Sequence, residues 1–191
     1  MALGFYFDSA MCIGCRTCHM ACKDLHGLNL GSAFRRVRAF EVGLYPDVDG
    51  FRYSASCYHC GNATCLESCP VGALSYADDG TVQLDSAVCM GCKVCMDNCP
   101  FDALQFLENK KIVGKCDSCK HLRDEGNNPV CVDSCLMRCL DFGNFDELKA
   151  KYGPDVVLEL PILPYEIGNQ PHVLIKAKPC AFKLDYREVE I

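Results

Sequence analysis

The sequence predicts a loop-rich α+β fold made of two similar modules, with a surface arm and an extended C-terminal tail. Three observations support this prediction. Of the 191 residues, 18 are cysteine, and sixteen of these fall into four sets of four. Two short patterns each occur twice along the sequence, which indicates a duplicated unit. The stretches between the sets have the length and composition of short strands, turns and one short helix.

The third cysteine set, from Cys89 to Pro100, has the clearest motif. Its spacing, C-x2-C-x2-C-x3-C-P, is the one that bacterial ferredoxins use to hold [4Fe–4S] clusters. Thiolates are soft ligands that suit iron–sulfur cores, and the first three can wrap a loop around one cubane. The fourth, Cys99, lies beyond that loop and in a two-cluster arrangement ligates the neighbouring cluster. We therefore interpret the fold as two bacterial-type 2[4Fe-4S] ferredoxin modules.

The N-terminal region starts with an expected short strand at residues 5–7 and then reaches the first set, Cys12, Cys15, Cys18 and Cys22. The pattern Asp-Ser-Ala-x-Cys-x-Gly-Cys begins at residue 8 and again at residue 85, so the cluster loop is repeated. Gly14 and Gly91 stand where such a loop must turn tightly, and glycine tolerates that backbone conformation.

Residues 23–56 predict a surface strand or hairpin arm. Here apolar Phe34, Val37, Phe40 and Val42 are interleaved with charged Arg35, Arg36, Arg38 and Glu41. Two interpretations stay open, a surface that docks a partner and a plain solvated face.

The second set consists of Cys57, Cys60, Cys65 and Cys69. The pattern C-P-x-x-A-L starts at its last cysteine, over residues 69–74, and recurs at residues 99–104. A turn at residues 78–80 is expected to join two short strands, residues 74–76 and 82–84. The second and third sets therefore define a self-contained two-cluster unit, residues 56–108, called module B below.

The fourth set, Cys116, Cys119, Cys131 and Cys135, is stretched by a polar insert at residues 120–130. Two cysteine pairs separated by a loop also form a structural-zinc pattern. Iron is favoured because the first set otherwise lacks the partner that its own fourth cysteine requires. The first and fourth sets define module A, residues 1–55 plus 109–143.

Two cysteines remain outside the sets. Cys139 occupies the position of Ala73 and Ala103 in the C-P-x-x-A-L segments, so we interpret it as a small buried residue rather than a ligand. Cys180 has no companion and is interpreted as structural. The tail, residues 144–191, is expected to start with a capped helix at 144–152. Five prolines and one convincing strand, residues 173–175, then predict a segment that lies along a surface.

Composition excludes several classes of protein. Cysteines two or three residues apart form poor disulfides, so the thiols were loaded with metal while reduced, which points to assembly in a reducing cytosol. The net charge of −6, before any cluster is added, argues against a nucleic-acid partner. No apolar run is long enough to span a membrane, and no signal peptide is expected at the N-terminus. The twin arginine at residues 35–36 is internal and is not a signal.

Charged residues beside the cysteines suggest how the clusters are tuned. The cations Arg16, Lys93, Lys115 and Lys120 would stabilise a reduced cluster and raise its potential; the alternative is that they are exposed and balance surface charge. His19 and His59 lie in cluster loops, but cysteine already fills all sixteen ligand positions, so histidine ligation is disfavoured. No catalytic constellation is visible, so we do not expect the protein itself to be an enzyme.

These motifs resemble the four-cluster iron–sulfur subunits of molybdopterin oxidoreductases, most closely the DMSO reductase type. The resemblance covers residues 5–145 most strongly and includes residues 7–8 and 140–143 beside the cysteine sets. It implies four [4Fe–4S] clusters with these ligands: Cys12, Cys15, Cys18 and Cys135; Cys22, Cys116, Cys119 and Cys131; Cys57, Cys60, Cys65 and Cys99; Cys69, Cys89, Cys92 and Cys95. Some relatives replace one ligand of the third set with tryptophan, whereas this sequence has Cys92 and no tryptophan.

The resemblance also implies partners and a location. Members bind a molybdenum or tungsten pyranopterin catalytic subunit and often a quinol-reactive membrane anchor. It implies a peripheral protein, held at a membrane through its partners, assembled in the cytoplasm and exported folded with a partner that carries a twin-arginine signal. A cytoplasmic location is the alternative. The leading hypothesis is an electron-transfer subunit; the alternatives are a free soluble polyferredoxin, which would need neither the arm nor the tail, and a zinc-stabilised scaffold.

Overall fold

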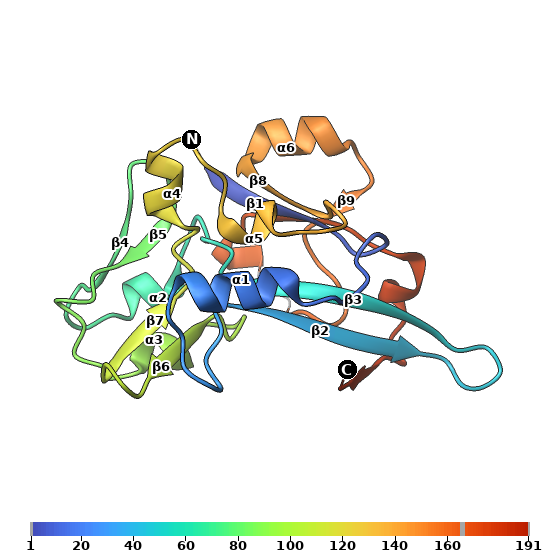
Figure 1. Ribbon diagram of the computed structural model, residues 1–191, viewed down its shortest axis with the longest axis horizontal. Helices are drawn as coiled ribbons and strands as arrows, with labels where there is room; N and C mark the ends of the chain where they lie inside the picture. Colours follow the sequence, from blue (N-terminus) through green and yellow to red (C-terminus); the bar gives the residue numbers. More distant parts are fainter. Residues whose placement is uncertain (1, 165–166, 191) are drawn as a thin grey trace.

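A four-stranded sheet joins the N-terminal strand to strands from the last third of the chain (Figure 1). In this computed structural model, which describes residues 2–164 and 167–190, the strand order is β8-β1-β10-β9. The bounds are Leu3–Asp8 for β1, Leu140–Asn144 for β8, Val156–Val157 for β9 and Val173–Lys176 for β10. Strand β1 pairs in parallel with β10 and antiparallel with β8. The expected strand at residues 5–7 is confirmed, and it lies inside a sheet.

A single glycine allows β1 to approach its neighbours. A Cβ built on Gly4 would lie 2.5 Å from the carbonyl oxygen of His172 and 2.7 Å from the ring of Phe145. No real side chain tolerates such contacts, so any other residue would push β1 away from β10 and from α6, Phe145–Tyr152.

The arm is a hairpin of β2, Arg35–Val42, and β3, Asp49–Ser56, and in Figure 1 it extends away from the rest of the molecule. A third strand, β11, Arg187–Val189, pairs with β2. Buried and half-buried residues alternate along the first half of β2, as expected for a strand with one face on the core. The expectation that Arg35 belongs to a surface strand is wrong: its side chain is buried, because it lies on the same face as Val37.

Two small hairpins lie in and beside module B. One pairs β4, Leu74–Tyr76, with β5, Val82–Leu84. The other pairs β6, Leu104–Leu107, with β7, Ile112–Lys115, which lies just beyond residue 108, the predicted end of the module. The predicted strands and the turn between them are confirmed for β4 and β5. Both hairpins contribute to a separate small core that includes Leu74, Val82 and Leu104.

Short helices follow or interrupt the cysteine loops. Their bounds are Thr17–Leu25 for α1, Thr64–Glu67 for α2, Val94–Asp97 for α3, Lys120–Asp124 for α4 and Val130–Asp133 for α5. The longer α6 starts after Asn144, whose Oδ1 accepts hydrogen bonds from the backbone N–H groups of Asp146 and Glu147, and it ends at Gly153. The predicted capped helix is confirmed.

The tail differs from its prediction. It contributes three strands, β9, β10 and β11, and two short 3₁₀ helices, Ile167–Asn169 and Pro179–Phe182. Strand β10 is an inner strand of the sheet, and its Ile175 has no exposed surface. The predicted strand at residues 173–175 is confirmed as β10. The expectation that this part of the tail lies along a surface is wrong, because paired neighbours on both sides enclose β10. Within the described residues, no helix is long and apolar enough to cross a membrane.

Candidate iron–sulfur site

The four cysteine loops share one backbone conformation. In each C-x-x-C opening, the residue before the second cysteine has a positive φ: Gly14 at 76°, His59 at 48°, Gly91 at 72° and Ser118 at 55°. Glycine adopts this region freely, whereas His59 and Ser118 do so at a cost of about 1 kcal/mol or more each. Both are fully buried, so packing holds them there. The stretched fourth loop therefore turns in the same way as the other three.

The third cysteine lies alike in every set, and the fourth lies alike in the last three sets. Cys18, Cys65, Cys95 and Cys131 each lie in a short helix. In the last three sets the fourth cysteine is followed, three residues later, by a left-handed residue: Gly72, Asp102 or Arg138. This turn directs backbone N–H groups at the cysteine sulfur, as for Ala73, whose N–H donates to Cys69 Sγ at 3.3 Å. The C-P-x-x-A-L pattern thus encodes a turn around a thiolate.

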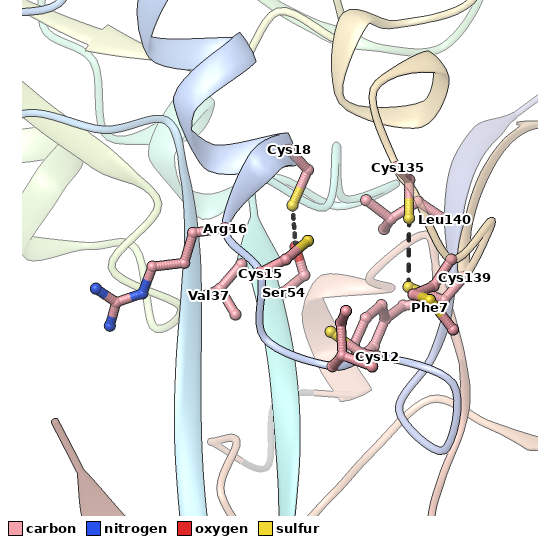
Figure 2. Close-up of a pocket in the computed structure, with 12 residues that line it drawn as sticks. Phe7, Cys12, Cys15, Arg16, Cys18, Val37, Ser54, Cys135, Cys139 and Leu140 are labelled. Carbon is pink, nitrogen blue, oxygen red and sulfur yellow. Dashed lines mark hydrogen bonds between the residues drawn. The ribbon is translucent and has the colours of Figure 1, made fainter. Parts of the chain in front are cut away.

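Four predicted ligands from two distant parts of the sequence line one cavity (Figure 2). Cys12, Cys15 and Cys18 come from the first loop, and Cys135 follows α5. The rest of the lining is mostly apolar and includes Phe7, Val37 and Leu140. Among the described residues, no carboxylate or imidazole lines this cavity, so its chemistry is that of sulfur.

A fifth cysteine lies at the same cavity. Cys139 is buried, and its Sγ lies 3.4 Å from Cys135 Sγ. The small, buried character expected for Cys139 is confirmed. Its thiol adds a weak S–H donor where Ala73 and Ala103 carry only a methyl group.

A second cavity in module B is lined by another predicted set, Cys69, Cys89, Cys92 and Cys95. Apolar residues such as Val71 and Val113 complete the second lining. Both sites therefore combine three sulfurs from one loop with one sulfur from a distant set.

The other eight predicted ligands gather in two buried groups. Burial, together with the neighbouring thiols of Cys57 and Cys99, raises the pKa of Cys65 to about 12. Burial, together with the neighbouring Cys131 and Cys119, likewise raises the pKa of Cys22 to about 12. The members of these groups are Cys57, Cys60, Cys65 and Cys99, and Cys22, Cys116, Cys119 and Cys131.

The chemistry of these groups fits iron–sulfur clusters. Thiols with a pKa of about 12 stay protonated at neutral pH, so they become ligands only when a metal displaces their protons. A soft metal bound to four thiolates compensates their buried negative charge. The common loop conformation disfavours a separate zinc role for the fourth set, since its opening turns as the other three do.

The predicted cations differ in burial. Arg16 and Lys93 are exposed, and Lys93 Nζ lies 4.1 Å from the centre of the Phe106 ring. Lys120 forms an ion pair with Asp124. The surface-charge interpretation is wrong for Lys115, which is buried and donates from Nζ to the carbonyl oxygens of Val82 and Cys116.

Two histidines, His59 and His26, lie near the cysteine loops. His59 is fully buried, and its Nδ1 accepts a hydrogen bond from the Val82 N–H, which leaves the proton on Nε2. Burial lowers the pKa of His59 well below its usual value, so the ring is neutral. His26 was not predicted to lie at a cluster site. Its Nε2 lies 3.6 Å from Asp117 Oδ1 and 4.0 Å from Cys119 Sγ. No local motif marks His26, because it reaches Cys119 from the far end of α1.

Sulfur-lined cavities and repeated cysteine turns define a ferredoxin-type iron–sulfur protein. Family comparison agrees: a model described as "4Fe-4S dicluster domain" matches residues 48–145, and a second with the same description matches residues 11–74. The sequence is 41% identical to the B subunit of anaerobic dimethyl sulfoxide reductase from Escherichia coli over 181 residues, 91% of this protein and 87% of that one.

Two further relatives extend the comparison. The sequence is 40% identical to the protein of the same name from Haemophilus influenzae, over 91% of this protein and 88% of that one. It is 29% identical to "Protein NrfC" of Escherichia coli, over 98% of this protein and 82% of that one. The protein therefore belongs to the family of iron–sulfur electron-transfer subunits that includes the B subunit of dimethyl sulfoxide reductase, and its cofactors are four [4Fe–4S] clusters. The predicted family and cofactors are confirmed.

Proposed function

We propose that this protein transfers electrons between a catalytic subunit with a molybdenum or tungsten pyranopterin cofactor and a redox partner such as a quinol-reactive membrane anchor. The observation that best supports this proposal is the 41% identity, over 91% of the sequence, to a protein named as the B subunit of a reductase. A B subunit implies at least one other subunit, and substrate chemistry is assigned to such a partner. The protein described here is non-catalytic.

The proposed ligands form four sets in two modules. In module A they are Cys12, Cys15, Cys18 and Cys135, and Cys22, Cys116, Cys119 and Cys131; in module B they are Cys57, Cys60, Cys65 and Cys99, and Cys69, Cys89, Cys92 and Cys95. The sulfur lining of the two cavities supports two of these sets directly. Mutual effects among neighbouring thiols support the other two.

The residues around each set bind the group and shield it from water. When bound, each [4Fe–4S] cluster takes up and releases one electron. Backbone N–H groups donate to ligand sulfurs, as from Ala73 to Cys69 and from Ser118 to Cys116, both at 3.3 Å. Such hydrogen bonds stabilise added negative charge on the ligand sulfur and raise the reduction potential.

Location follows from the partners in this proposal. The protein is peripheral, held at a membrane through a partner, assembled in the cytoplasm and exported folded with a partner that carries a twin-arginine signal. The absence of a membrane-spanning helix among the described residues is consistent with attachment through a partner.

Anaerobic purification of the native complex, with iron, zinc, molybdenum and tungsten measured, tests the proposal. The expected result is about sixteen irons per copy of this protein together with molybdenum or tungsten, since four clusters of four irons are proposed. About sixteen irons with no second metal would indicate a free polyferredoxin. Zinc in place of iron would overturn both the function and the ligand sets.

A further inference from the structure

Arg35 is a buried cation with no anionic partner among the described residues. Its side chain is 1% exposed, and its Nη1 donates to the carbonyl oxygen of Ser54 at 3.1 Å and to Ser54 Oγ at 3.0 Å. Nε and Nη2 have no hydrogen-bond partner within that part of the structure. None of the ion pairs in residues 2–164 and 167–190 includes Arg35.

Arg35 lies between the Phe5 ring, whose centre is 4.6 Å from its Cζ, and cysteines of module A. Ser54 Oγ, which accepts from Arg35, also lies 3.7 Å from Cys18 Sγ. Although burial lowers the pKa of the guanidinium, nearby Cys131, Cys18, Cys116 and Cys22 raise it by a larger amount once they are thiolates. Cys18 belongs to one proposed ligand set of module A and the other three belong to the second. Arg35 therefore acts on both sets.

A buried ion without a counter-charge is strongly destabilising, so a guanidinium in this position requires an anion. A cubane with four thiolate ligands carries a net negative charge of about −2 when oxidised and more when reduced. On the proposed ligand sets, two such anions flank Arg35. The two unpartnered donor atoms are then accounted for by sulfur acceptors that the bound clusters supply.

We propose that Arg35 is the shared counter-charge of the two module A clusters, raising the reduction potential of both. A fixed cation favours the more negative, reduced form of each cluster. Its role is to position charge, and it takes part in no bond-making step. A different cation, the buried Lys115, lies near Cys65 of module B, and all its hydrogen bonds among the described residues go to the carbonyl oxygens of Val82 and Cys116. Lys115 stays unchanged in the Arg35 variants, so the module B clusters serve as an internal reference.

The same strand provides a matched control. Arg36 follows Arg35 on β2, but its side chain is 42% exposed and forms a 3.3 Å ion pair with Asp102. Both residues are arginines in one strand, and they differ in the face on which they lie. Arg35→Met and Arg36→Met therefore make the same chemical change at a buried and an exposed position.

The test is an anaerobic redox titration of the native complex, followed by electron paramagnetic resonance, with iron content measured on each sample. In Arg35→Met the reduction equilibrium of two of the four clusters should shift at least about tenfold toward the oxidised form, about 59 mV in midpoint. The other two should stay in place, and Arg36→Met should leave all four unchanged.

Iron content separates the possible failures. A wild-type protein without about sixteen irons would refute the ligand sets themselves. A fully loaded Arg35→Met with four unchanged midpoints would refute only the role of Arg35. If Arg35→Met loses module A iron, Arg35→Lys decides: retention of four clusters by this still cationic variant supports the charge role. Equal iron loss in both variants would overturn it in favour of packing.

Discussion

Modules A and B contain the same cysteine turns but differ in how far apart along the sequence their sets lie. In module B both sets lie within residues 57–99, and short hairpins close the unit. In module A the first set ends at Cys22 and the fourth begins at Cys116. Helix α1 packs against α5, and β1 pairs with β8 to join these distant segments.

The two modules therefore differ in whether short-range or long-range contacts bring their ligand sets together. The two sets of module B lie close in sequence, so bringing them together costs little entropy. The tail contacts module B through a loop: the N–H groups of Gly61 and Asn62 donate to the carbonyl oxygens of Gln170 and Asn169. In module A the tail supplies a whole strand, β10, which pairs with β1. We therefore expect module A to depend on the tail more than module B does.

Of the variants considered, Ile175→Asp should cause the largest difference in iron content between modules A and B. Ile175 has no exposed surface and pairs with Phe7 of β1, so a buried carboxylate there should destabilise the sheet by about 4 kcal/mol or more. Module A should lose its iron while module B keeps about eight irons. Iron analysis and absorbance spectra measure this. Leu158→Asp, at a position 44% exposed, is the control; equal loss from both modules would contradict the greater dependence of module A on the tail.

Asp79→Asn should have the next largest effect, because it breaks a link between the modules. Asp79 Oδ2 lies 2.6 Å from Arg123 Nη1, and both side chains are mostly buried. Although burial raises the pKa of Asp79, hydrogen bonds from Thr81 and Arg123 lower it to about 2. Loss of the carboxylate should cost about 2 kcal/mol, measured as a lower urea midpoint for loss of cluster absorbance.

The pH dependence of that effect has a definite sign. Because the pKa of Asp79 is lower in the folded than in the unfolded state, its stabilisation is complete above about pH 4 and is lost as the pH falls toward 2. The difference in stability between Asp79→Asn and the wild type should therefore stay constant from pH 6 to 8. Glu108→Gln, which breaks the exposed Lys111 pair, should change stability by less than about 0.5 kcal/mol. A difference that varies across this pH range would refute the assignment.

Lys93→Glu should have a smaller, electrostatic effect. Lys93 lines the second cavity beside Cys92, but it is exposed to solvent, whereas Arg35 is enclosed. Solvent and salt screen an exposed charge, so one module B midpoint should fall by less than about 59 mV. The fall should shrink as salt is raised in the redox titration. A midpoint shift larger than that of Arg35→Met would contradict the claim that a buried charge acts more strongly on a cluster than an exposed one.

Cys139→Ala should have the smallest effect. Alanine already occupies the matching positions 73 and 103, so the variant should keep about sixteen irons. Loss of the S–H near Cys135 should change only the spectrum or midpoint of one module A cluster. Loss of four irons would instead make Cys139 a ligand.

Local signals explain what the sequence predicted correctly. The Asp-Asp-Gly turn and its flanking strands, the Asn144 cap and the glycines of the cluster loops each depend on residues close in sequence. The cysteine spacing predicts three ligands in one loop and a fourth that serves a neighbouring cluster. The full ligand sets are what the family resemblance implies; they stay a prediction, which the sulfur lining of the two cavities supports.

Long-range features were not predictable in the same way. Strand β10 lies between β1 and β9 through parallel and antiparallel pairing that no local pattern specifies. Strands β9 and β11 are too short, at two and three residues, to show a period. The burial of Arg35 did have a signal, since alternation places it with Val37, but an arginine-rich strand favoured the interpretation of an exposed face.

The enclosed guanidinium of Arg35 also bears on the life of the protein before iron arrives. Folding module A around a cation with no anion would consume several kcal/mol of a net stability that is typically about 5–15 kcal/mol. On the proposed role of Arg35, we therefore expect a newly made copy without iron to leave this strand and its cysteine loops open. Proteases act on open copies. Ordinary degradation in the cell would then select iron-loaded copies without a dedicated sensor.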